Sequence, residues 1–329
     1  MHHEKVIIVG AGPCGMAAAI ALQDQGIEPL IIEKENIVNT LYNFPTHQTF
    51  FSSSEKLEIG DVAFITEKQR PVRNEALTYY REVAKRKDLR INAFERAENI
   101  KKLDAGFEVT TTDRQGQESK YIAQFVVIAT GYYDQPNYLH IPGENLAKVT
   151  HYFKEAHPYY DKNVVIIGGK NSAVDAALEL HKAGARVTVL YRGSEYSRSI
   201  KPWILPGFDS LAKKESIHLV FRANVTQITE DSVFYNVDGK EEIIKNDYVF
   251  AMTGYQPDIP FLQNLGIEID QSNGMPAFDE VTYESNIQGI FLAGVVTAGY
   301  NNNAIFIENG RFHGNHIAKA IMSKIEAKV

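Results

Sequence analysis

Short apolar runs recur along the chain, and glycine or polar residues bound each of them. The clearest are Val6–Val9, Phe125–Ala129 and Val164–Ile167. Continuous apolar runs of this length are typical of strands that are buried on both faces of a parallel sheet. Residues 76–86 have helical spacing and are rich in helix-forming residues. The pattern therefore predicts alternating strands and helices.

Two segments repeat the same order of strand, glycine turn and helix. Residues 6–22 read VIIVGAGPCGMAAAIAL, and residues 164–180 read VVIIGGKNSAVDAALEL. A second pair of apolar strands, Phe125–Gly131 and Tyr248–Gly254, both end in Thr-Gly. We therefore predict an α/β fold with two similar, Rossmann-like dinucleotide-binding domains, each opened by a βαβ unit.

The segments between and after the repeats fit this plan. Phe107–Thr112 and Tyr121–Phe125 have the pattern of hairpin strands joined by a polar turn. The tail supplies one more strand, Ile290–Ala293, and a final helix from about Arg311 to Ile325. Since each domain already has its own opening unit, we expect the tail to return and complete the first domain.

Two crossings of the chain set the expected domain boundaries. Pro136–Gly143 contains two prolines and a glycine, which suits a linker, and Tyr255–Asp258 suits a second crossing. We expect residues 1–135 and 257–329 to form one domain, and residues 136–256 to form a second domain inserted into it.

Composition narrows the class of protein. The 329 residues carry 34 basic and 41 acidic side chains, for a net charge of −7, and the basic residues form no run, which argues against a nucleic-acid binder. We expect no membrane span, because no apolar run approaches the roughly 20 residues that one needs. A single cysteine, Cys14, allows no internal disulfide and fits a reducing compartment. We expect a cytoplasmic protein, and whether it forms homo-oligomers stays open.

The first glycine turn has the pattern of a dinucleotide site. Gly10 permits a tight turn, Gly12 lets a pyrophosphate approach the backbone, and Gly15 lets helix and strand pack closely. Glu33, at the end of the next apolar strand, is placed to accept hydrogen bonds from ribose hydroxyls. The residues that we assign to this site are Gly10, Gly12, Pro13, Gly15, Glu33 and Lys34.

The second turn differs in charge. Tyr191 stands where the first copy has Glu33, and Arg192 follows it. An acid would repel a 2′-phosphate, whereas Arg192, with Arg198, would attract it, so we predict NADP(H) here. The alternative, that Arg192 is a solvated surface charge, stays open. The residues that we assign to this site are Gly168, Gly169, Lys170, Asn171, Ser172, Ala173, Arg192 and Arg198.

With these motifs, nearly the whole chain resembles flavoproteins with two dinucleotide-binding domains, particularly the thioredoxin-reductase-like group. The resemblance implies FAD in the first domain and NADPH in the inserted one. It places segments around Thr130, Gly294 and Asn302–Ala304 beside the flavin, although the family's usual ribitol-binding Asp is replaced by Val295. The further FAD contacts that it implies are Gln48, Thr130, Gly131, Gly294, Val295 and Ala304.

The chain departs from that group in its redox cysteines. Thioredoxin reductases carry Cys-x-x-Cys where this chain reads His151–Lys154, and the glutathione-reductase branch carries its pair where this chain reads Asn39–Phe51. With one cysteine, no internal dithiol relays electrons from flavin to substrate. Thioredoxin reductase is therefore excluded.

A closer resemblance is to the bacillithiol-disulfide reductases of low-GC Gram-positive bacteria. The segments that carry it are Gly12–Gly15, Asn43–Ser54, Tyr191–Pro206 and Phe306–Gly314. The resemblance implies NADPH-dependent reduction of the disulfide of a low-molecular-weight thiol, with hydride passing from NADPH to FAD and then to the disulfide. It also implicates a lone cysteine at the position of Cys14.

Two residues are candidates for catalysis. Cys14 stands at the first turn of a helix, where the helix dipole favours thiolate and an adjacent pyrophosphate opposes it. A small residue packed against FAD is the alternative role. His47 lies in a loop that the resemblance places beside the flavin, where it could protonate a leaving thiolate, and His313 is a weaker candidate. No cluster has metal-ligand spacing, so we expect no metal.

Two other functions remain open. A ferredoxin or flavodoxin NADP reductase has the same architecture and also needs no cysteine, but it transfers single electrons. A non-catalytic flavin redox sensor would not need the second nucleotide site, whose motif the chain retains.

Overall fold

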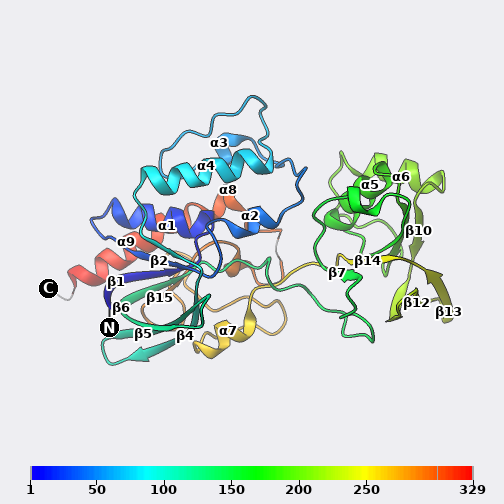
Figure 1. The fold of residues 1–329 in the computed structure, drawn as a ribbon. Coiled ribbons are helices and arrows are strands. Elements are labelled where there is room, and N and C mark those ends of the chain that lie inside the picture. The colour runs from blue at the N-terminus through cyan, green and yellow to red at the C-terminus, as the bar shows by residue number, and fades with distance from the viewer. Residues whose placement is uncertain (1, 302, 328–329) are drawn as a thin grey trace. The chain divides into compact units, whose positions relative to one another are not determined.

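The computed structural model describes residues 2–301 and 303–327, and contacts divide the chain into two units (Figure 1). The first unit comprises Met1–Asn43, His47–Gln135 and Tyr255–Val329, and the second comprises Phe44–Thr46 and Pro136–Gly254. The second unit is therefore an insertion in the first. Which cofactor each unit binds stays a prediction.

Among the described residues, the first unit is built on a seven-stranded sheet in the order β3-β2-β1-β6-β5-β4, with β15 beside β6. Its strands are β1 (His2–Val9), β2 (Leu30–Glu33), β3 (Ile91–Ala93), β4 (Glu95–Leu103), β5 (Gly106–Asp113), β6 (Glu118–Ile128) and β15 (Ile290–Leu292). Strand β5 pairs antiparallel with both β4 and β6, and the remaining pairs, β3-β2, β2-β1, β1-β6 and β6-β15, are parallel. Ile290–Leu292 pair with Val126–Ile128, which confirms that the tail returns to the first unit.

Helices cover this sheet, and Figure 1 shows α1 and α9 on the same face of it. The helices of the first unit are α1 (Pro13–Gln23), α2 (Asn39–Asn43), α3 (Ser54–Leu57), α4 (Arg73–Arg86), α7 (Ile259–Asn264), η2 (Gly294–Ala298), α8 (Ile307–Gly310) and α9 (His313–Glu326). Small residues let α1 and α9 pack closely, since a Cβ at Gly314 would lie 2.6 Å from the Cα of Ala18. The final helix begins at His313 rather than Arg311, because the separate turn α8 precedes it.

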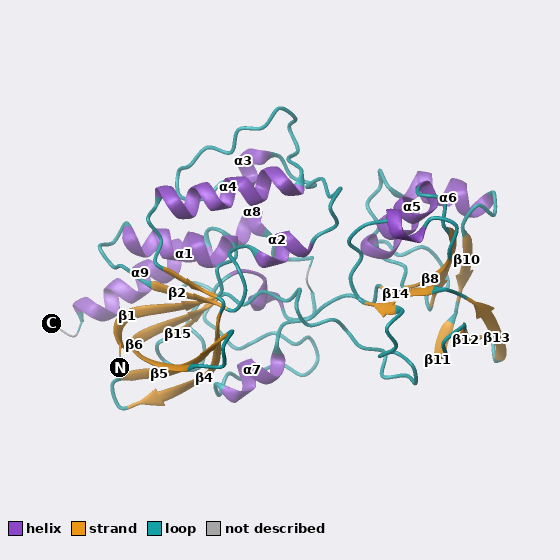
Figure 2. Cartoon of the chain, in the orientation of Figure 1, coloured by secondary structure: helices purple, strands orange, loops and turns teal. Residues whose placement is uncertain are grey.

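The second unit holds a parallel sheet in the order β10-β9-β8-β14-β7 and a separate antiparallel sheet of β11, β12 and β13 (Figure 2). Its strands are β7 (Val149–Thr150), β8 (Asn163–Ile167), β9 (Arg186–Tyr191), β10 (His218–Phe221), β11 (Asn224–Ile228), β12 (Ser232–Val237), β13 (Lys240–Lys245) and β14 (Tyr248–Ala251). Its helices are η1 (His157–Tyr159), α5 (Asn171–Lys182) and α6 (Leu205–Lys213).

The predicted apolar runs form the two cores. Every residue of Val6–Val9 and of Val164–Ile167 is buried, as expected of central strands with both faces covered. Each run ends at a glycine turn that leads directly into a helix, α1 in the first unit and α5 in the second. The two repeated units thus place two similar turns at the carboxyl ends of the parallel strands β1 and β8, where nucleotides bind in such folds.

Candidate functional site

Glycine is required at two positions of the first turn. Gly10 has φ +109°, and a Cβ there would lie 2.5 Å from the carbonyl oxygen of Ala129. A Cβ at Gly15 would lie 2.0 Å from the carbonyl oxygen of Gly10. At Gly12, in contrast, nothing lies within 4 Å of the added atom. The turn is therefore tight behind Gly10 and Gly15 and open at Gly12, as a pyrophosphate requires.

Glu33 ties the second strand to this turn. Its Oε2 accepts the backbone N–H of Ala11 at 2.7 Å, and its Oε1 accepts the N–H of Glu35 at 2.9 Å. Burial raises the pKa of Glu33, while these two hydrogen bonds act in the opposite direction. Each carboxylate oxygen has a further lone pair, so the group can still accept a ribose hydroxyl. Lys34 forms an ion pair with Asp134 at 2.9 Å.

Thr130 and Gly131, at the end of β6, leave a second opening. The Thr130 hydroxyl is buried and has no hydrogen-bond partner within the described ranges. Gly131 has φ +72°, and a Cβ there would meet no atom within 4 Å. A buried hydroxyl without a partner is costly, so a polar ligand group at this position would satisfy it. Both openings fit a bound dinucleotide.

Cys14 packs against backbone that carries no side chain. A Cβ built at Gly294, or at Gly310, would come within 2.9 Å of the Cys14 sulfur. Burial, and next the nearby Glu308 carboxylate, raise the pKa of the Cys14 thiol to about 12. Desolvation thus outweighs the helix dipole, which was one of the two effects expected from the sequence. A thiol with a raised pKa carries little thiolate at neutral pH.

His313 contacts Gly294, the residue that lies against Cys14. Its ring is buried and stacks on Tyr283, with centroids 4.1 Å apart, and its Nδ1 accepts the backbone N–H of Gly294 at 3.1 Å. Burial lowers the pKa of His313 to about 4, so the ring is neutral at pH 7. This geometry fits a residue that fixes Gly294 against Cys14. It does not supply the proton donor that the sequence suggested as one role.

The remaining predicted flavin contacts lie on less buried segments. His47 is exposed in the loop after α2, and Gln48 beside it is half-buried. Val295 begins η2 together with Gly294 and offers no carboxylate. Ala304 is exposed, and Asn302 lies outside the described residues. These placements leave the predicted contacts as predictions.

Several residues of this region were missed in the sequence. Ser52 donates a hydrogen bond to the Glu308 carboxylate, and Arg311 donates to the backbone carbonyls of Glu55 and Glu58. Arg73 is buried and donates to the carbonyl of Leu41 at 3.1 Å. These bonds hold α8 against α3, and α4 against α2. Ser52 and Glu308 fall in segments already singled out for their family resemblance, but no local pattern pairs them.

The second turn has the same backbone course with different side chains. Gly168 donates its N–H to the carbonyl of Leu190 at 3.0 Å, and its φ is +142°. A Cβ at Gly169 would lie 2.3 Å from the ring of Tyr191, so that ring packs directly on the turn. Lys170 is exposed just before α5, and Ala173 is buried in its first turn. The turn can therefore carry a cation at its open side.

The two predicted arginines are exposed in the second unit. Neither Arg192 nor Arg198 forms an ion pair with any residue that the structure describes. Asn171, the first residue of α5, donates from Nδ2 to the carbonyl of Ser199 at 2.8 Å and accepts the N–H of Lys201 at Oδ1, at 2.9 Å. Ser172 is exposed beside it. Two unpaired guanidinium groups near a glycine turn are suited to a phosphomonoester.

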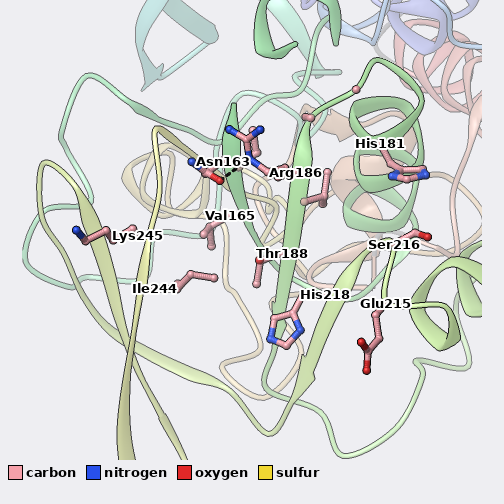
Figure 3. A pocket seen from close by; sticks show the side chains of 14 residues that line it. Asn163, Val165, His181, Arg186, Thr188, Glu215, Ser216, His218, Ile244 and Lys245 are labelled. Carbon is pink, nitrogen blue, oxygen red and sulfur yellow. Dashed lines mark hydrogen bonds between the residues drawn. The ribbon is translucent and has the colours of Figure 1, made fainter. Parts of the chain in front are cut away.

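Figure 3 shows a pocket in the second unit that contains none of the predicted site residues. It lies where β8, β9 and β10 begin, which is the opposite end of these strands from Gly168 and Arg192. Arg186 on its rim is already paired with Asp161 and with Asn163, the bond drawn in the figure. The pocket is therefore separate from the predicted nucleotide turn.

Residues 2–301 and 303–327 contain neither a metal-binding cluster nor a helix that could span a membrane. No group of three or more His, Cys, Asp or Glu side chains is arranged to hold a metal ion. No helix combines the length and apolar character that crossing a membrane requires.

Comparisons with known proteins agree closely with one another. Residues 7–294 match the model of the pyridine nucleotide-disulphide oxidoreductase family. Bacilliredoxin reductase Bdr of Bacillus subtilis (strain 168) is 60% identical over 325 residues, covering 98% of this chain and 99% of that protein. Bacillithiol disulfide reductase Bdr from Bacillus cereus is 62% identical, with a TM-score of 0.97, and covers 98% of this chain and 100% of its own. The Staphylococcus aureus structure of the same name is 56% identical, with a TM-score of 0.94, and covers 98% and 99%.

Proposed function

Because the chain belongs to the pyridine nucleotide-disulphide oxidoreductase family, we propose that it uses FAD to reduce a disulfide with electrons from NADPH. One observation carries the proposal: the glycine turn of the first unit is followed by the acid Glu33, and the glycine turn of the second unit is followed by Arg192. The single cysteine fits a reducing compartment, so the proposal includes a cytoplasmic location.

The residues present fit FAD in the first unit. Gly12 leaves room for the pyrophosphate, the N-terminus of α1 supplies N–H groups to it, and Glu33 accepts from the adenosine ribose. The unpartnered Thr130 hydroxyl offers a hydrogen bond to the bound cofactor. When bound, FAD supplies a centre that accepts a hydride from NADPH and gives two electrons to a disulfide.

The residues of the second unit fit NADPH. Lys170 and the N-terminus of α5 would hold the pyrophosphate, and Arg192 with Arg198 would hold the 2′-phosphate. Tyr191 has no charge to repel that phosphate, unlike Glu33 in the first unit. We therefore propose that the second unit selects NADPH over NADH.

The disulfide is proposed to be that of a low-molecular-weight thiol, bacillithiol disulfide. The support is the name shared by the Bacillus cereus and Staphylococcus aureus structures. A second candidate is bacilliredoxin, because the Bacillus subtilis relative is named as its reductase. Both substrates need a two-electron reductant, and neither needs a second cysteine in this chain.

The Cys14 sulfur lies against Gly294 and Gly310, and desolvation raises the pKa of its thiol, so Cys14 would serve as a packing group rather than as an attacking thiolate. In that case the chain's own residues bind the cofactor, exclude water around α1 and hold Gly294 in place. The thiolate role implied by the family resemblance remains the alternative that mutation of Cys14 tests.

The test uses purified protein under anaerobic conditions. We expect a yellow protein that releases FAD on denaturation, loses its flavin colour with NADPH, and recovers it on addition of bacillithiol disulfide. Bacilliredoxin in its disulfide form is added in parallel, and the faster oxidant identifies the substrate. Release of FMN, or colour recovered only by one-electron acceptors such as ferredoxin, would contradict the proposal.

A further inference from the structure

One side chain joins the second glycine turn to the loop that carries Arg198. Asn171 begins α5, and its amide makes hydrogen bonds to the Ser199 carbonyl at 2.8 Å and to the Lys201 N–H at 2.9 Å. The donor and the acceptor of one amide are thus both used on the same loop, two residues apart. This double contact fixes the loop against the first turn of the helix.

The same loop is also anchored from its other side. The Tyr196 hydroxyl donates to Asp209 of α6 at 3.1 Å, and the Tyr196 ring packs edge-on against Phe208 and Phe221. Ile200 is only 5% exposed. Arg198 lies between these fixed points, yet it is exposed and has no ion pair among the described residues. The chain therefore orders the backbone around a cation that has no protein partner there.

We propose that Asn171 is a positioning residue for the 2′-phosphate of NADPH: its amide holds the Ser199–Lys201 segment so that Arg198 is ordered before the nucleotide arrives. The inference rests on the proposed use of NADPH and adds a residue through which the preference acts.

The physical reason is the cost of ordering a loop on binding. A flexible arginine loop would lose conformational freedom when the phosphate binds, and that loss would reduce the affinity. Two hydrogen bonds to a helix already formed remove most of this cost beforehand. The first unit has Pro13 at the matching position, which has no amide to make such contacts. The two hydrogen bonds of the Asn171 amide are therefore specific to the arginine-bearing turn.

The experiment compares Asn171→Ala, Asn171→Asp and a control, Asn163→Ala, as holoenzymes. Asn163 also uses both sides of its amide, donating to Asp247 at 3.3 Å and accepting from Arg186 at 2.9 Å, but it lies where β8 begins, at the opposite end of that strand from the turn. Dissociation constants for NADPH and NADH come from the dependence of flavin reduction on nucleotide concentration. Adenosine 2′,5′-bisphosphate and 5′-AMP serve as inhibitors that differ in the 2′-phosphate alone.

We expect Asn171→Ala to weaken NADPH binding by about 5- to 10-fold, as loss of two neutral hydrogen bonds suggests, and NADH binding by less than about 2-fold. Inhibition by adenosine 2′,5′-bisphosphate should weaken in parallel, and more than inhibition by 5′-AMP. Asn171→Asp keeps the acceptor for Lys201 but loses the donor to Ser199, and its negative charge lies at the start of α5 near the proposed pyrophosphate position, so it should weaken NADH binding as well as NADPH binding. Asn163→Ala should match the wild type.

Equal weakening of NADPH and NADH by Asn171→Ala would overturn the inference and leave the proposed function intact. Equal affinities of the wild type for the two nucleotides would contradict the NADPH proposal itself, and the inference with it. If Asn171→Ala does not fold, the ratio of NADPH to NADH affinity in Tyr196→Phe decides. Tyr196→Phe releases the loop from Asp209 without touching α5, and it should shift the ratio of the two affinities in the same direction.

Discussion

Gly10 and Gly168 occupy the same position in the two repeated units, and each donates its N–H to the neighbouring strand, to Ile32 at 2.9 Å and to Leu190 at 3.0 Å. From there the units diverge. The Glu33 carboxylate accepts the N–H of Ala11, whereas the Tyr191 ring packs on Gly169, the matching residue of the second turn. One backbone course thus accommodates a buried acid in one unit and an uncharged ring in the other.

The next residue repeats the contrast. Lys34 follows Glu33 and is neutralised by Asp134 at 2.9 Å, whereas Arg192 follows Tyr191 and has no ion pair among the residues described. A buried acid with a neutralised neighbour suits a ribose with free hydroxyls, and an unpaired cation suits a ribose that carries a phosphate. The backbone provides the pyrophosphate site, and the end of the second strand selects the nucleotide.

The turns also differ in what packs over them. Gly294 and Gly310 of the C-terminal segments lie against Cys14 in the first unit. In the second unit the 192–201 loop is held by Asn171. The predictions that follow change one unit at a time and use the other as the reference.

The largest effect is expected from Gly15→Ala. Its Cβ would lie 2.0 Å from a backbone oxygen, and backbone cannot give way cheaply, so we expect a loss of about 3 kcal/mol or more in unfolding free energy, together with loss of FAD. The matching Ala173→Gly should cost only about 1–2 kcal/mol through helix propensity and a lost methyl group. Thermal unfolding and the flavin-to-protein ratio measure both. Retention of FAD and of stability by Gly15→Ala would show that the first turn accepts a Cβ at this position as the second turn does at Ala173.

The second effect is the loss of NADPH selectivity in Arg192→Ala. Removing a charge-assisted contact to the 2′-phosphate should cost about 1.5–3 kcal/mol, or roughly 10- to 150-fold in NADPH affinity, and leave NADH nearly unchanged. Lys34→Ala is the matched change in the first unit and should not alter the ratio of the two affinities. If Arg192→Ala weakens both nucleotides alike, the arginine does not contact the 2′-phosphate.

Much of this difference could be predicted from the sequence because it lies in local patterns. Strand, glycine turn and helix follow each other directly along the chain. Each domain already has its own opening βαβ unit, so the sequence predicts that the tail strand returns to the first domain, where β15 pairs with β6. The neighbours of Cys14 could not be predicted, because Gly294 and Gly310 are brought to it by packing of segments distant in the chain. Nor does any pattern pair Asn171 with the Ser199 backbone. Periodicity reveals which face of an element is buried, but not what lies against it.

The third effect is a pH dependence of stability, which is expected from His313 beside the first turn but not from Asn171 at the second. His313 holds Gly294 and its folded pKa, about 4, lies below its usual value of 6.5, so its contribution to stability is present above pH 6.5 and is lost as the pH falls toward 4. We expect a loss on the order of 2 kcal/mol between pH 7 and pH 5 from this group. Asn171 does not titrate, so its hydrogen bonds at the second turn should not change over this range.

Thermal unfolding at pH 7 and pH 5 measures this loss in the wild type and in His313→Asn. The asparagine side chain can still accept the Gly294 N–H but cannot be protonated. The variant should be less stable at pH 7 and should change less with pH. A variant with the same pH slope as the wild type would show that the acid sensitivity arises elsewhere.

The smallest effect is expected from Cys14→Ala, which asks whether the first turn holds a reactive group or a packing group. Its counterpart, Ser172, is exposed, whereas the Cys14 sulfur lies against Gly294 and Gly310, and burial raises its pKa. Alanine leaves a small void there, for a cost of about 1 kcal/mol in unfolding free energy, and FAD content and the rate of flavin reduction by NADPH should not change.

If the disulfide reacts directly at the cofactor, reoxidation of the reduced variant by bacillithiol disulfide should stay within about 3-fold of the wild type, since the barrier changes by less than 1 kcal/mol. A fall of several orders of magnitude, with flavin reduction intact, would instead identify Cys14 as the nucleophile and require that cofactor or substrate binding lowers its pKa. Ser172→Ala, in the matching position of the second unit, controls for the loss of a small polar side chain at the start of a helix.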